Sequence, residues 1–188
     1  MNQISFSFRV FFIIFCAGTS NTFGENSFVV KEKFDKNKSI AQKNIEVVDG
    51  FCLLNQDNYK TIEPLALSMG GHLTNSDADI AISENGGQSF VVPYFGQMYI
   101  VGYAKKGGCT VGTEHIDANN TRSLLVKNLS LQEIYREESL SQISEWYSVE
   151  KPGRFAGSMI ILTYSKDEVK SKTGTIAFMP ASVVSSLQ

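Results

Sequence analysis

The stretch Ala104–His115, AKKGGCTVGTEH, places Cys109 between a glycine pair and a short alternating segment. A cysteine in this position could be a nucleophile, a metal ligand or half of a disulfide. A reactive or metal-bound thiol usually has histidine close to it, and the chain contains only His72 and His115. The redox compartment decides between these roles, and the N-terminal sequence indicates the compartment.

The first 24 residues have the pattern of a secretory signal peptide. A single basic residue, Arg9, precedes the apolar run Val10–Ala17, and the first acidic residue is Glu25. The run is much shorter than the roughly 20 apolar residues that a membrane-spanning helix needs. Small residues near the end of the segment favour cleavage after Gly24. We therefore expect an exported protein, located in the periplasm or secreted.

The three cysteines are assigned from this expectation. Cys16 raises the alternative of a lipoprotein, but a lipobox has a small residue before its cysteine and Phe15 stands there. Cleavage leaves Cys52 and Cys109 in an oxidising compartment, where two cysteines allow one intramolecular pairing. We predict a disulfide between them, which would close a loop of about 58 residues and stabilise the fold by about 4 kcal/mol.

Composition limits the classes of partner. The chain has a net charge of −2 at pH 7 and 43% hydrophobic residues. Since the signal peptide holds one basic and no acidic residue, the processed chain is more negative than the precursor. An acidic chain without a long basic run is not expected to bind nucleic acid. Beyond the signal peptide no apolar segment approaches membrane length, so no transmembrane segment is expected in the mature chain.

The remaining chain divides into an arm and one domain. Residues 25–43 are lysine-rich and weakly periodic, which predicts a flexible N-terminal arm. Residues 44–188 are predicted to form a single α+β domain. One helix is expected from Asp57 or Asn58 to Gly70, and a second from Asp117, with a restart at Ser130 because Ser130 and Glu133 are spaced as a capping box.

Six further runs have the composition of strands: 89–95, 97–104, 109–116, 144–149, 158–165 and 174–181. The fold class expected from this order is α+β, with one antiparallel sheet of five to six strands and two or three packed helices. In the run 97–104 the residues on both faces are apolar, which predicts a central strand that is covered on each side.

The order of these features resembles a group of small exported bacterial proteins that are periplasmic or carry a lipoprotein signal. The similarity rests on an early cysteine and helix, on strands leading to GGCTV, and on DANNTRSLLVKNL before a final strand pair, and spans residues 51–181. The resemblance implies a location in the cell envelope and supplies no active-site residues.

Motifs that carry chemistry are few. Asn75, Asp77 and Asp79 have the spacing of the first ligands of a calcium loop, but Ile80 and Gly86 stand where the turn glycine and the bidentate glutamate belong. The two histidines do not have the spacing of a zinc motif. We therefore expect no metal, no cofactor and no catalytic residue.

The function expected from these observations is protein binding in the periplasm, and one candidate is an immunity-type inhibitor of a toxin. Exposed loops at 75–88 and 137–145 would make the contact. The candidate surface consists of Asp77, Asp79, Tyr94, Phe95 and Tyr147. Two alternatives remain open: an exported hydrolase with a site around His72 or His115, and a module that binds a small ligand between helix and sheet.

Overall fold

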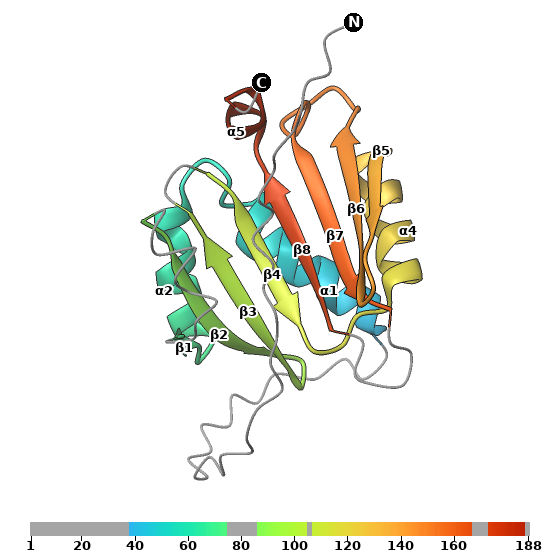
Figure 1. Ribbon diagram of the computed structural model, residues 1–188. Coiled ribbons are helices and arrows are strands. Elements are labelled where there is room, and N and C mark those ends of the chain that lie inside the picture. Colours follow the sequence, from blue (N-terminus) through green and yellow to red (C-terminus); the bar gives the residue numbers. More distant parts are fainter. Residues whose placement is uncertain (1–37, 75–85, 105–106, 167–172, 187–188) are drawn as a thin grey trace, which may run out of the picture. The chain divides into compact units, whose positions relative to one another are not determined.

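Eight antiparallel strands form one sheet in the order β1-β2-β3-β4-β8-β7-β6-β5 in the computed structural model of this protein (Figure 1). The structure describes residues 38–74, 86–104, 107–166 and 173–186. The strands are β1 (His72–Leu73), β2 (Gln88–Tyr94), β3 (Gln97–Tyr103), β4 (Cys109–Thr113), β5 (Leu131–Glu138), β6 (Gln142–Val149), β7 (Met159–Ser165) and β8 (Gly174–Met179).

The sheet consists of two antiparallel runs of four strands that meet at its centre. Strands β1 to β4 follow one another, helix α4 then carries the chain to the far edge, and β5 to β8 return to pair with β4. The helices are α1 (Ile40–Val48), α2 (Ile62–Ser68), α4 (Ala118–Leu129) and α5 (Ala181–Ser185), with a π-helix at Asp49–Leu53 and a 3₁₀ turn at Tyr59–Thr61. Figure 1 shows α1, α2 and α4 behind the sheet, all on one face.

The predicted count of five to six strands with two or three helices is wrong, since the sheet has eight strands and the described residues form four α-helices. The largest error lies at residues 131–138, where a second helix was expected from the Ser130–Glu133 spacing. Ser130 instead ends α4 in the left-handed conformation, with φ 53°, and the next eight residues form β5. Pairing with β6 over this whole length outweighs the local helix propensity.

Helix α1 begins in the range where a flexible arm was expected. It begins at Ile40, inside the range 25–43, and its start is explained by a capping box between Ser39 and Gln42. Its residue Asn44 is fully buried and donates from Nδ2 to the His115 carbonyl, while its Oδ1 lies 3.0 Å from the Tyr99 hydroxyl. The helix therefore belongs to the core of the domain.

The core lies between the sheet and helices α1, α2 and α4. Each central strand contributes its alternate residues to this helix-covered face. The most deeply buried of these side chains are Phe90, Val92, Tyr99, Val101, Val111, Ile160, Leu162, Ile176 and Phe178. Apolar residues on the opposite face of β3 led us to expect a second cover there, yet no described helix lies across that face.

Helix α2 ends at Ser68, just before the Gly70–Gly71 pair that was expected to close it, and this end lies close to the sheet. Gly70 has φ 79°, and a Cβ at Gly71 would lie 2.8 Å from the carbonyl oxygens of Ala66 and Val91. A larger residue would push the end of the helix away from β2. Among the described helices, none is long and apolar enough to cross a membrane.

The predicted disulfide between Cys52 and Cys109 is confirmed. The π-helix that follows α1 brings Cys52 against the first residue of β4, with the two Cα atoms 5.4 Å apart and both cysteines at most 1% exposed. The bond closes a span of 57 residues and joins the N-terminal helices to the centre of the sheet. A buried disulfide is compatible with an extracellular location.

Removing this bond should destabilise the domain by up to about 4 kcal/mol, because the unfolded chain regains the freedom of the closed loop. The measurement is urea unfolding of the wild type, with and without reductant, beside the double variant Cys52→Ala/Cys109→Ala. Peptide mapping of native protein under non-reducing conditions is expected to recover residues 52 and 109 in one cross-linked species. Two alkylated, unlinked cysteines would contradict the assignment.

Candidate binding surface

The face of the sheet opposite the helices is free of charge over six strands. Strands β2, β3, β4, β6, β7 and β8 contain one charged residue, Glu145, and it lies on the helix-covered face. Most surfaces of soluble proteins carry interspersed charges of both signs. An uncharged area of this width is the most unusual surface feature of the described chain.

The residues of this face align in two rows that cross the sheet through register pairs. The first row is Val91, Ile100, Gly112, Thr175, Thr163 and Ser144. The second row is Ser89, Gly102, Thr110, Ala177, Ile161 and Trp146. We call these twelve residues the open face.

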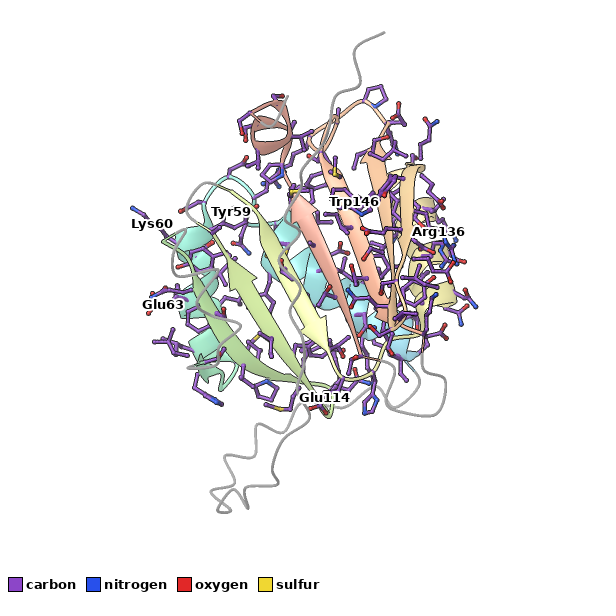
Figure 2. All side chains as sticks on the ribbon, viewed as in Figure 1. Tyr59, Lys60, Glu63, Glu114, Arg136 and Trp146 are labelled. Carbon is purple, nitrogen blue, oxygen red and sulfur yellow. A yellow bond between two sulfur atoms is a disulfide. The ribbon has the colours of Figure 1, made fainter. Side chains whose placement is uncertain are left out.

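The composition of the open face is apolar or hydroxyl-bearing. Three of its twelve residues, Ser89, Gly102 and Gly112, are buried, and the other nine are half-buried. The Ser144 and Thr163 hydroxyls lie 3.0 Å apart and hydrogen-bond to each other. At one side of the face Met98 is 46% exposed, and at the other Tyr135, on β5, is 55% exposed. Figure 2 labels Trp146 on the sheet and Arg136 at its outer edge. Such a surface can bind apolar or hydrogen-bonding groups but has no charge with which to hold an ion.

Tyr135 and Trp146 form an aromatic pair where the open face reaches β5. They are register partners, with ring centroids 6.1 Å apart and an interplanar angle of 77°. Edge-to-face pairs of this kind contribute about 0.5–1.5 kcal/mol beyond their buried area. The pair fixes the position of Tyr135, which would otherwise be a freely rotating side chain on an edge strand.

A second feature, with two half-buried aromatic side chains, is the β2–β3 turn. Tyr94 and Phe95 lie here with ring centroids 4.2 Å apart, and Phe95 has φ 47°, a conformation that bulky residues rarely adopt. Lysines near the start of α1 hold the turn: Lys43 donates to the Phe95 carbonyl at 3.2 Å, and the Lys38 ammonium lies 4.9 Å from the centre of the Phe95 ring. The Tyr94 hydroxyl donates to Glu46.

The most polar site in the interior surrounds Glu145. This carboxylate is 0% exposed and accepts from Arg122 Nε at 2.7 Å, Arg122 Nη2 at 2.5 Å and Arg136 Nη1 at 3.0 Å. The hydroxyls of Tyr147 and Tyr164 each donate to it at 2.8 Å. We call these five residues the Glu145 cluster. They join α4, β5, β6 and β7.

The pKa values in this cluster follow from its hydrogen bonds. Burial alone would raise the pKa of Glu145, but donation from Arg122, Tyr147 and Tyr164 and the charge of Arg122 outweigh it and hold the pKa below its ordinary value. Burial and the neighbouring carboxylate raise the pKa of Tyr147 and of Tyr164. The hydrogen bond to Glu145 raises the pKa of Arg122, so the ion pair stays charged.

This arrangement stabilises structure and is unsuited to acid–base chemistry. A carboxylate offers about four acceptor positions, and the five donors around Glu145 already occupy them. A substrate would have to displace an arginine to reach it. Breaking such a pair leaves an uncompensated buried charge, which is more costly than the pair is stabilising.

The structure separates the residues that the sequence proposed as a binding surface. Tyr94 and Phe95 are neighbours in the β2–β3 turn and half-buried. Tyr147 is only 2% exposed and belongs to the Glu145 cluster, so its assignment to the surface is wrong. Asp77 and Asp79 lie outside the described residues.

The loop expected at 137–145 is shorter than predicted. Its last residue, Glu145, is buried in β6, and Glu137 belongs to β5, so the turn itself is short and contains the fully exposed Leu140. Alternation along 143–149 gives a signal that could have placed Glu145 on the same inward face as Tyr147. Nothing local in the sequence indicates that Arg122 and Arg136 meet it.

The two histidines lie at the surface of the described chain. His72 lies on the edge strand β1 and His115 follows β4, and both are exposed. Within the described ranges neither imidazole hydrogen-bonds to a hydroxyl or a carboxylate. The described residues also contain no group of three or more His, Cys, Asp or Glu that could hold a metal ion.

Comparison with known proteins adds no relative: no protein-family model, no curated protein and no solved structure matches the chain.

Replacing Glu145 by glutamine should lower the free energy of unfolding by about 1–3 kcal/mol, because its hydrogen-bond donors lose their charged acceptor while Arg122 and Arg136, 26% and 44% exposed, remain accessible to water. The control is Asp57→Asn, which breaks the exposed Asp57–Arg154 pair and should change the free energy by less than about 1 kcal/mol. Urea unfolding at pH 7 measures both.

The same variant should alter the dependence of stability on pH. Because the pKa of Glu145 is lower in the folded state, its contribution is present above the pKa of the unfolded chain and is lost as pH falls through the folded value. Stability of the wild type should therefore fall more steeply on acidification than that of Glu145→Gln. If the free energy of unfolding changed with pH equally in the wild type and in Glu145→Gln, the pKa of Glu145 would be the same in the folded and unfolded states, which would contradict this prediction.

Proposed function

We propose that this protein is exported and acts by binding another protein through the open face. The observation that carries the proposal is the uncharged face, on which no described helix packs. Its side chains can exclude water against a partner without burying an unpaired charge. The partner that fits is a protein surface with few charges, presenting small apolar and hydroxyl groups.

Export is supported by the N-terminal sequence and by the disulfide. The location proposed is the periplasm or the medium, after removal of residues 1–24. An immunity-type inhibitor that binds a toxin is the narrower form of the proposal. Such a role depends on surface contact and needs no reacting group. The hydrolase alternative gains no support from His72 or His115, because neither imidazole hydrogen-bonds to a hydroxyl or a carboxylate within the part of the chain that the structure describes.

Processing can be measured directly. The intact mass and N-terminal sequence of protein recovered from the periplasm or the medium are expected to begin at Glu25. A chain that keeps residues 1–24 in the cytosol would contradict export. A lipid-modified Cys16 at the new N-terminus would replace cleavage after Gly24 by lipoprotein processing.

Partner binding can be tested with a charge placed at the centre of the open face. Immobilised wild-type protein is expected to capture a partner from envelope extracts, and Thr175→Lys should reduce that capture at least about tenfold, since a lysine there would be buried unpaired. The matched control is Leu140→Lys, which adds the same charge at the exposed β5–β6 turn. Circular dichroism and thermal unfolding establish that both variants are folded.

Equal capture by wild type and Thr175→Lys would exclude the open face as the binding surface. The enzyme alternative would replace the proposal if no protein is captured and a substrate panel shows turnover that His115→Ala abolishes.

A further inference from the structure

The open face has a size pattern that divides at the seam between β4 and β8. In the first row the larger residues, Val91 and Ile100, lie on the β2–β3 side and small residues on the other. In the second row the order is reversed, with Ile161 on the β7 side and Gly102 on the β3 side. In each row the larger side chains therefore lie on one side of the β4–β8 seam, and the side differs between the two rows.

A two-fold axis that runs along the strands between β4 and β8 exchanges these halves. It places the first strand of the sheet order over the eighth, the second over the seventh and the third over the sixth. Ile100 of one copy then faces Thr163 of the other, and Ile161 faces Gly102. At the centre, Gly112 faces Thr175.

We propose that the open face binds a second copy of this chain, with large residues of each copy facing small residues of the other across this two-fold axis. The inference rests on the proposed function and names its partner. Interfaces between identical chains are commonly self-complementary in this way, and facing sheets pack well when large and small side chains alternate.

The absence of charge on the open face also favours a second copy as its partner. Two processed copies, each more negative than the precursor with its net charge of −2, repel one another wherever their acidic residues meet. The open face lets them associate without such contacts. The residues that extend the first row to the two sheet edges are His72 on β1 and Glu137 on β5, and the axis brings His72 of one copy over Glu137 of the other, so no like charges face each other at the rim.

The size of the face indicates a modest affinity. Six strands at about 4.8 Å spacing, with a length of about 20 Å along the strands, give roughly 600 Å² per copy. The total of about 1,200 Å² lies at the lower limit of specific protein interfaces. We therefore expect dimerisation on the order of micromolar concentrations.

The decisive experiment is sedimentation velocity of the processed protein over a range of about 1 to 200 µM, a window that spans the expected midpoint. The wild type and Leu140→Lys are expected to shift from monomer to dimer. Thr175→Lys should weaken the dimer at least about 100-fold, since two lysines would meet near the axis. Thermal unfolding of each variant separates loss of association from loss of folding.

A size exchange tests the arrangement itself. Thr163→Phe places a large side chain opposite Ile100 and should weaken the dimer, and the double variant Thr163→Phe/Ile100→Ala should restore it. A wild type that stays monomeric at every concentration overturns the inference, as does a dimer unaffected by Thr175→Lys. A double variant that fails to recover overturns the pairing of large with small residues.

These results are separable from the test of protein binding. A monomeric wild type that still captures a partner through Thr175 defeats the second-copy inference and leaves the proposed function standing. A monomer that captures nothing defeats both.

Discussion

The pairing of β4 with β8 is the contact on which the rest of the structure depends. Among the described strands it is the only ladder that joins the two four-stranded runs into one sheet, with Cys109 paired to Phe178 and Thr113 to Gly174. The inward residues of this seam are almost fully buried, and the disulfide fixes its first residue to the π-helix after α1. Without the seam there would be neither a continuous core nor a continuous open face.

The Glu145 cluster attaches a helix to the second half of the sheet, as the disulfide attaches helices to the first half. Cys52–Cys109 attaches the N-terminal helices to β4, whereas Arg122 attaches α4 to β6 and Arg136 attaches the edge strand. A buried carboxylate is a poor source of net stability compared with apolar packing, but it accepts one arrangement of donors and excludes others. In this chain it fixes how α4 crosses β6 and β7.

The sequence predicted what is local and missed what depends on distant partners. Alternating runs indicated the six central strands, and the cysteine pair indicated its own disulfide. Residues 131–138 contain good helix formers, and only the presence of β6 makes them a strand. The start of α1 carried a readable signal, since Ser39 and Gln42 form a capping box. Tyr147 was placed on the surface as an aromatic residue near a turn, although the alternation along 143–149 indicates an inward position. Its hydrogen bond to Glu145 has no sequence signature.

The sequence of β3 contains the reason to look for a partner. Met98 and Ile100 alternate with Tyr99 and Val101, a pattern that predicts cover on both faces, and described helices cover only one. Apolar residues on a solvated face would add nothing to folding of the monomer and would favour non-specific association. A face that combines them with glycine and hydroxyl residues in a two-fold size pattern would limit association to one geometry. The proposed docking of a second copy would account for both the missing charges and the reversal of large and small residues across the β4–β8 seam.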